Sequence, residues 1–249
     1  MTGKGVRNIQ TDLHAMEDPP LASLSLTHVR YNPNDPLSYA SAWLALVPQG
    51  LCVTYVSLIW ASREIEILLM FAGQMACEAL NFVLKRLIRE ERPTQMHGKG
   101  YGMPSSHSQF VAFFSVSLSL WLLFRHVPTT GEDYSPSTYA ERLLLSVLAC
   151  MGAAAVGASR VYLNYHTPKQ VLIGMAAGAS FAVIWFLFTT SLRRYGWIEW
   201  GLDTWISRKF RFRDLITTED MQDGGWVRWE SRRRAKRRID VNGMSKKAI

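Results

Sequence analysis

The chain has 249 residues, of which 48% are hydrophobic, and a formal net charge of +8 at pH 7. This charge does not indicate a nucleic-acid partner, because residues 192–249 alone hold 15 Lys and Arg against 8 Asp and Glu. The apolar residues are gathered into long blocks between short charged segments, which is typical of a membrane protein. We therefore expect a membrane as partner and no nucleic acid.

The cysteines exclude two further classes of protein. Cys52, Cys77 and Cys150 each fall inside an apolar block and lack metal-type spacing, so neither a disulfide framework nor a zinc site is indicated. We expect all three to be small buried residues.

In chain order, residues 1–40 are polar and contain no signal peptide, and we expect them to form a lumenal N-terminal segment. The transmembrane domain is expected over residues 41–191, as an all-α polytopic bundle. A helix that spans a bilayer core needs roughly 20 residues. Five apolar segments are candidates for such helices, namely Ser41–Ala61, Ile65–Leu84, Ser108–Phe124, Leu143–Ala158 and Val171–Phe188.

Polar and small residues inside these segments indicate how the helices pack. Glu78 and Asn81 interrupt the second segment, so we expect that face to turn toward the bundle interior. The small-residue runs 152–155 and 174–179 predict close helix packing. After the fifth segment, Tyr195–Phe212 is expected along the membrane surface, not as a sixth span, and residues 192–249 as a basic cytosolic tail.

Three polar clusters occur at the ends of these segments. In the first, Lys85 and Arg92 are seven residues apart, about two helical turns, so both are expected on one helical face, where they suit anionic oxygens. The second, Pro104–His107, directly precedes the third segment, where free N–H groups at a helix N-terminus favour a phosphate. There Ser105 adds a hydroxyl group and His107 a titratable proton.

The third cluster lies between the fourth and fifth segments. Arg160 offers a planar fork for two phosphate oxygens, and His166 has a pKa compatible with attack as a neutral imidazole. If all five segments cross the membrane, the loops after the second and fourth lie on the same side. The three clusters are therefore expected to share one surface.

In this order, Lys-x6-Arg-Pro, Pro-Ser-x-His and Ser-Arg-x5-His resemble the three signatures of the type 2 phosphatidic acid phosphatase superfamily, whose fold is shared with haloperoxidases. More narrowly, GYGMPSSHSQF (100–110), SRVYLNYHTPKQVL (159–172) and SLTHV (25–29) look like the dolichyldiphosphatase branch. The similarity extends over most of residues 22 to 239.

The resemblance implies a role for each residue of the three clusters. His166 would attack the terminal phosphorus of dolichyl diphosphate and form a phosphohistidine, and His107 would protonate the departing dolichyl phosphate. The phosphoryl oxygens would be held, without a metal ion or other cofactor, by Lys85, Arg92, Ser105, the Ser106 backbone and Arg160. The lipid carrier would thereby be recycled for protein N-glycosylation.

Two positions depart from the superfamily pattern. Glycine often stands where this chain has Ser106, and an acidic residue usually stands four positions after the nucleophile, where this chain has Gln170. Gln170 can accept the ring N–H of His166 but brings no charge, so it is a candidate orienter of the nucleophile. The dolichyldiphosphatase branch looks similar in having Gln there.

Several alternatives stay open at this point. The motifs specify phosphate chemistry better than the lipid, so phosphatidic acid or a shorter prenyl diphosphate is an alternative substrate. A catalytically silent scaffold of the same fold is suggested by Gln170 but disfavoured by the two histidines. Glu78 either pairs with Lys85 or Arg160, or lines a wet cavity. No catalytic role is expected for His14, His28, His97 and His126.

The direction in which the site faces follows from charge. Five crossings place the termini on opposite sides, and the basic tail favours a cytosolic C-terminus, so the clusters would face the lumen. The loop that holds the first cluster is also basic, but a phosphate-binding role accounts for several of its charges. The final residues, Lys246–Ile249, resemble the dilysine signal of endoplasmic-reticulum membrane proteins.

Overall fold

The computed structural model describes residues 22–24, 29–92, 100–128, 137–221 and 226–247. Within these ranges the chain is mainly helical, and five helical stretches are long and apolar enough to cross a membrane. They are α1 (Pro36–Leu44) with α2 (Val47–Ser62), α3 (Ile65–Ile88), α4 (Ser106–Leu120) continued by η1 (Trp121–Arg125), α5 (Tyr139–Tyr162) and α6 (Pro168–Arg194). The expected helical membrane bundle is confirmed.

Every span is longer than its apolar segment, and at α5 and α6 polar caps begin the helix before the apolar residues. The Thr138 and Thr167 side chains each accept a hydrogen bond from the backbone N–H three residues on. The side chain of that third residue accepts one from the backbone N–H of the threonine, so capping boxes begin α5 and α6. The spans therefore measure 20 to 27 residues, enough for the roughly 20 that a bilayer core requires.

The end of α3 differs from the expectation. The helix stops at Ile88, because Arg89 takes a left-handed conformation with φ of 50° and its N–H bonds back to the Lys85 carbonyl. Arg92 therefore lies in the following loop, and the prediction that Lys85 and Arg92 project from one helical face is wrong.

The residues exposed on the bundle surface are largely apolar, as a lipid-facing surface requires. Leu144, Met151 and Leu172 are each more than half exposed. Cys77 is buried and Cys52 partly so, but Cys150 is exposed on α5. The expectation of a buried Cys150 is wrong, because in lipid an apolar environment lies outside the bundle as well as inside it.

Two glycines of α6 bring this helix directly against α4, and the two helices form the most extensive pair in the bundle. A Cβ atom at Gly174 would lie 2.7 Å from the Ser105 carbonyl oxygen, and one at Gly178 would lie 2.2 Å from that of Gln109. The expectation of close packing holds here. In the 152–155 run it holds for Ala153, which is buried against Phe110 and Val111 of α4, and it fails for Gly152, which is exposed with no atom near its Cβ position.

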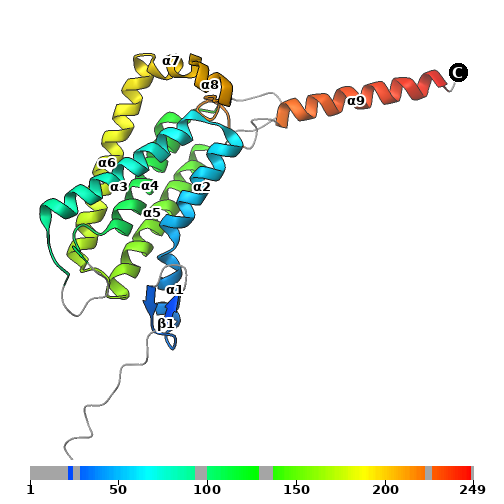
Figure 1. The fold of residues 1–249 in the computed structure, drawn as a ribbon. Coiled ribbons are helices and arrows are strands. Elements are labelled where there is room, and N and C mark those ends of the chain that lie inside the picture. The colour runs from blue at the N-terminus through cyan, green and yellow to red at the C-terminus, as the bar shows by residue number, and fades with distance from the viewer. Residues whose placement is uncertain (1–21, 25–28, 93–99, 129–136, 222–225, 248–249) are drawn as a thin grey trace, which may run out of the picture.

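The chain reverses direction at each span, so the two ends of the bundle carry different segments (Figure 1). One end holds the α3–α4 and α5–α6 connections together with a hairpin that the sequence did not predict. Its strands β1 (Ala22–Leu24) and β2 (Val29–Tyr31) pair antiparallel. Val29 packs with Ala42 and Leu163, which ties the N-terminal segment to the α5–α6 turn.

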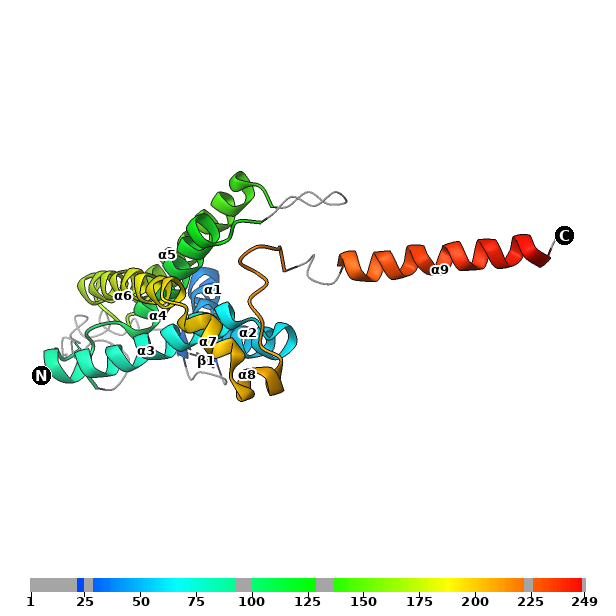
Figure 2. The ribbon, with the colours of Figure 1, turned by 90° about the horizontal axis from the view of Figure 1, so that it is seen from above.

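The other end holds α7 (Trp197–Asp203) and α8 (Trp205–Phe210), both too short to span. No sixth span is found within the described residues. Trp197, Trp200 and Trp205 are exposed on them, as expected for a segment at a membrane surface. Helix α9 (Trp226–Lys247) projects away from the bundle in both views (Figures 1 and 2).

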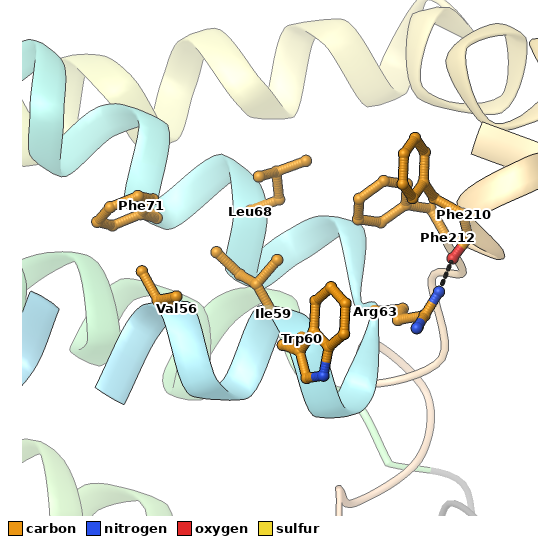
Figure 3. A pocket seen from close by; sticks show the side chains of 8 residues that line it. All are labelled: Val56, Ile59, Trp60, Arg63, Leu68, Phe71, Phe210 and Phe212. Atoms are coloured by element: carbon orange, nitrogen blue, oxygen red, sulfur yellow. Dashed lines mark hydrogen bonds between the residues drawn. The ribbon is translucent and has the colours of Figure 1, made fainter. Parts of the chain in front are cut away.

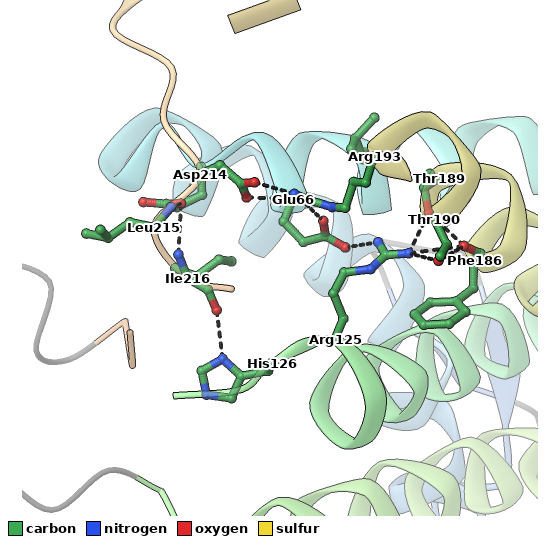
Figure 4. A network of polar contacts seen from close by, with 12 residues as sticks. Glu66, Arg125, His126, Phe186, Thr189, Thr190, Arg193, Asp214, Leu215 and Ile216 are labelled. Carbon is green, nitrogen blue, oxygen red and sulfur yellow. Dashed lines mark hydrogen bonds and ion pairs between the residues drawn. The ribbon is translucent and has the colours of Figure 1, made fainter. Parts of the chain in front are cut away.

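A polar network joins the helices at this second end (Figure 4). Glu66 on α3 is 1% exposed and pairs with Arg125 of η1 and with Arg193 of α6, the latter at 2.5 Å. Arg193 also pairs with Asp214 in the segment after α8. A buried carboxylate with two cationic partners fastens three spans to one another.

Candidate active site

The three polar clusters of the sequence meet at the first end of the bundle. Burial and the charges of Arg92, Arg160 and Lys85 all act on His166. His107 in turn lies close enough to Arg160, His166 and Lys85 for their charges to act on it. The expectation that the clusters share one surface is confirmed.

The α5–α6 connection is a tight turn that sets Arg160 beside His166. Asn164 takes a left-handed conformation with φ of 54°, which asparagine tolerates better than most residues. The chain then folds back, so that the N–H groups of Tyr165 and His166 both donate to the Arg160 carbonyl, at 3.0 and 3.2 Å. Thr167 caps α6 immediately afterwards. One short segment therefore delivers both side chains to the same place.

The second cluster opens α4 as expected. Ser105 is the N-cap residue, but its side chain accepts no hydrogen bond from a backbone N–H of the first turn. Its hydroxyl instead accepts from that of Ser108 at 3.0 Å, and its N–H donates to the Gln170 carbonyl at 3.2 Å. The first N–H groups of α4 therefore have no side-chain cap, and an anion at this helix end can accept from them.

His107 lies in the first turn of α4, and its Nε2 is 3.2 Å from the Ala45 carbonyl oxygen. Since a carbonyl only accepts, Nε2 carries the hydrogen, and Nδ1 is left for proton transfer. His107 also lines a cavity of about 260 Å³ between α2, α3 and α4. The walls of this cavity are Pro48, Gln49, Cys52, Met75, Glu78, Ser106, His107 and Phe110.

Glu78 lines this cavity, and its carboxylate is close enough to Lys85 for the two charges to act on each other. Its Oε1 atom is buried without a hydrogen-bond partner. No ion pair joins Glu78 to Lys85 or Arg160 in the part of the chain that the structure describes. Of the two readings left open by the sequence, the structure favours the polar residue that lines a cavity.

His166 is 2% exposed, and its environment favours the neutral ring. Burial, followed by the positive charge of Arg92, lowers its pKa to about 4, although the hydrogen bond with Gln170 acts in the opposite direction. The Nδ1 atom is 3.2 Å from Gln170 Oε1. With the hydrogen on Nδ1, the Nε2 lone pair is available for nucleophilic attack at neutral pH.

Arg160 is the strongest indication of an anion in the site. Its side chain stacks on the Tyr165 ring at 4.3 Å and the residue is only 3% exposed. Its Nε and Nη1 atoms are buried without a hydrogen-bond partner among the described residues. Because a buried guanidinium needs acceptors for its donors, these two atoms fit the oxygens of a phosphoryl group.

One residue of the site was missed by the sequence analysis. Glu90, in the loop after α3, accepts from Gln170 Nε2 at 3.3 Å and from Lys169 Nζ at 3.0 Å. Its position inside the Lys-x6-Arg motif, two residues before Arg92, was the available signal. An acid in a basic loop is otherwise read as a solvated surface charge.

The remaining histidines lie elsewhere or outside the described residues. His126 is at the opposite end of the bundle, where its Nε2 contacts Asp220 at 2.8 Å and its Nδ1 the Ile216 carbonyl at 2.7 Å. His14, His28 and His97 fall outside the described residues, as does most of the 25–29 motif.

Another hollow, of about 280 Å³, lies at the end of the bundle that holds α7 and α8 (Figure 3). Its lining is almost wholly apolar, with Trp60, Phe71 and Phe212 among the side chains, and Arg63 at one edge bonds to the Phe210 carbonyl. None of the candidate catalytic residues lines it. The candidate site is therefore the place where the three polar clusters meet, around His107 and His166.

Comparison with known proteins agrees with this geometry. A family model described as the PAP2 superfamily matches residues 64–194, which include all three clusters. The chain belongs to the PAP2 superfamily. A crystal structure of a transmembrane PAP2 phosphatidylglycerolphosphate phosphatase from Bacillus subtilis superposes with a TM-score of 0.54, covering 66% of this chain and 82% of that chain at 22% identity. This match shows the shared fold.

Relatives within the PAP2 superfamily are named as dolichyldiphosphatases. A Neurospora crassa protein that is provisionally so named is 47% identical, over 89% of this chain and 96% of its own length. Dolichyldiphosphatase 1 of Homo sapiens is 40% identical over 67% of this chain and 71% of its own length. The Saccharomyces cerevisiae dolichyldiphosphatase is 29% identical over 86% of this chain and 92% of its own length. Family and relatives together identify the chain as a phosphatase.

Proposed function

We propose that this PAP2 protein hydrolyses dolichyl diphosphate to dolichyl phosphate and inorganic phosphate. The observation that carries the proposal is a buried, neutral His166 among Lys85, Arg92 and Arg160 at one end of a transmembrane bundle. The names of the relatives support the dolichyl substrate.

In the first chemical step, His166 Nε2 attacks the terminal phosphorus. The bond from that phosphorus to the bridging oxygen breaks, and a phosphohistidine forms. His107, protonated on both ring nitrogens before this step, gives its Nδ1 proton to the oxygen of the departing dolichyl phosphate and keeps its Nε2–H on the Ala45 carbonyl. Lys85, Arg92 and Arg160 stabilise the charge on the transferring phosphoryl group.

In the second step, water attacks the phosphohistidine while His107 accepts a proton from it. The phosphorus–nitrogen bond breaks, inorganic phosphate leaves and both imidazoles return to their starting state. The Ser105 hydroxyl and the Ser106 N–H hold phosphoryl oxygens through both steps, because they belong to the open N-terminus of α4.

The cavity beside His107 is suited to the leaving lipid phosphate. It lies between α2, α3 and α4, its walls are mainly apolar, and His107 and Ser106 lie at the same wall. An isoprenoid chain can therefore lie between these helices while its phosphate stays near the proton donor.

We further propose that the site faces the lumen of the endoplasmic reticulum and that the C-terminus is cytosolic. The site and helices α7 and α8 lie at opposite ends of the bundle (Figure 1). The basic segment that follows α6 favours the cytosol. If Lys246 and Lys247 act as a dilysine retention signal, replacing both by serine should let the protein pass to later compartments. Unaltered retention would mean that the two lysines do not retain it.

The decisive experiment is a phosphate-release assay on purified protein in detergent with EDTA, run beside His166→Ala. Wild-type protein should release phosphate from dolichyl diphosphate in preference to farnesyl diphosphate and phosphatidic acid, and His166→Ala should be inactive. Preference for phosphatidic acid would contradict the proposed substrate. Loss of activity with the chelator would contradict the metal-free mechanism.

A further inference from the structure

Glu90 is connected to the nucleophile through one side-chain amide. His166 Nδ1 contacts Gln170 Oε1 at 3.2 Å, and Gln170 Nε2 donates to Glu90 Oε1 at 3.3 Å. The other Glu90 oxygen accepts from Lys169 at 3.0 Å. A negative charge therefore lies one amide away from the imidazole, although position 170 itself is uncharged.

This arrangement determines which ring nitrogen can attack. A glutamine amide has one accepting and one donating end, and a carboxylate can only accept. Glu90 therefore requires the NH2 group of Gln170 on its side, and Oε1 must then face His166. The Thr167 N–H, which donates to the same Oε1 at 3.3 Å, acts in the same direction. Nδ1 must carry the hydrogen, and Nε2 is left as the nucleophile.

The backbone around Glu90 holds this contact in place. The Gly102 N–H donates to the Glu90 carbonyl at 2.8 Å, which fixes the loop after α3. A Cβ atom at Gly102 would lie 2.6 Å from Gln170 Nε2, so only glycine lets the loop pass this close to the amide. The hydrogen bond from Lys169, followed by that from Gln170, lowers the pKa of Glu90 and keeps it ionised.

We propose that Glu90 is a positioning residue, which fixes the tautomer of His166 through the Gln170 amide and supplies the negative charge that position 170 lacks. The inference rests on the proposed nucleophilic role of His166. The negative charge of Glu90 favours a positive charge on His166. It therefore opposes the effect of the groups that disfavour one, which are Arg92, Arg160, Lys85 and His107. Glu90 thereby stabilises the positive ring that forms with the phosphohistidine.

Three variants test the proposal. Glu90→Gln keeps the shape but removes the charge. The exchange Glu90→Gln with Gln170→Glu moves the carboxylate directly onto His166 Nδ1–H, and the new amide at position 90 can donate to it. Glu91→Gln is the matched control, since Glu91 is the exposed neighbour of Glu90 and its substitution also removes one negative charge.

Glu90→Gln should lower kcat about 10- to 100-fold, as expected for loss of a charge-assisted hydrogen bond, with little change in KM. The rising limb of its pH profile should move to lower pH, because a negative neighbour of His166 is gone. The exchanged pair should recover most of the lost turnover, and Glu91→Gln should match wild type. Unchanged turnover in Glu90→Gln, or an exchanged pair no more active than Glu90→Gln, would overturn the proposal.

A second measurement is independent of the lipid substrate. Diethyl pyrocarbonate acylates the free nitrogen of a neutral imidazole, and peptide mass spectrometry follows this reaction at His166. At pH 7 Glu90→Gln should slow it about tenfold, and the exchanged pair should restore it; equal rates would refute the role of Glu90. If wild-type protein cleaved phosphatidic acid but not dolichyl diphosphate, the proposed function would be contradicted. The proposed role of Glu90 would not be affected by that result.

Discussion

Replacing Gly178 by alanine changes the contact that holds α6 against α4. The added Cβ would lie 2.2 Å from the Gln109 carbonyl oxygen, whereas ordinary van der Waals contact begins at 3.4 Å. The two helices must therefore separate locally by about 1.2 Å, the difference between these two distances. His107 is on α4 and His166 lies one residue before the Thr167 cap of α6, so the separation displaces the two imidazoles from each other.

We expect two consequences of this displacement. A misplacement of about 1 Å can lower turnover about 100-fold, and an overpacked core loses about 1 to 3 kcal/mol of stability. Turnover is measured as phosphate release from dolichyl diphosphate, and stability as the thermal unfolding temperature in detergent. Assays run well below that temperature separate the two effects.

Gly152→Ala is the matched control. Gly152 lies on α5, is exposed and has no atom within 4 Å of its Cβ position. Alanine there should leave turnover unchanged and stabilise the helix by about 0.5–1 kcal/mol. If Gly178→Ala and Gly152→Ala had equal turnover, close contact between α4 and α6 would not set the geometry of the site.

Three further outcomes are expected. Arg160→Lys should lower kcat/KM about 10- to 100-fold, because an ammonium group cannot offer two parallel donors to phosphoryl oxygens; wild-type values would remove the guanidinium from the clamp. Acylation of His166 by diethyl pyrocarbonate should reach half its maximal rate near pH 4, since burial and a nearby arginine lower its pKa to about 4; a midpoint at pH 6.5 would contradict this. Glu66→Ala should cost about 3 to 5 kcal/mol of stability, because it leaves Arg125 and Arg193 without a shared buried carboxylate; an unchanged unfolding temperature would refute it.

The bundle and the convergence of the three clusters were predictable, because both depend on hydropathy and on the parity of crossings. The span ends were not, since polar caps such as Thr138 continue a helix beyond its apolar core. The position of Arg92 was mispredicted for a related reason. Spacing alone cannot show that Arg89 turns left-handed and ends the helix.

The burial of side chains on α5 was mispredicted because the usual rule, that apolar residues lie in the interior, does not hold for a helix in lipid. Cys150 and Gly152 are exposed, whereas Val156 and Gly157 on the same helix are buried. In water the apolar face would mark the interior, but in a bilayer both faces are apolar and only the contacts between helices decide. The contact between Gln170 and His166 was expected from the resemblance to the superfamily, in which an acidic residue usually stands at this position. The link from Gln170 to Glu90 was not, because that contact joins segments 80 residues apart.

The two ends of the bundle treat buried charge in opposite ways. At one end Glu66 pairs with two arginines, so the cations there are compensated within the protein. At the other end Arg160 is more deeply buried than Arg125 or Arg193, yet two of its donor atoms have no partner and no ion pair reaches it within the described ranges. A buried uncompensated cation is costly, and an anion bound at this end would offset that cost. The ion pairs of Glu66 can hold the helices together against the repulsion among the cations at the other end. In the proposed mechanism, relief of that repulsion favours binding of a phosphoryl group.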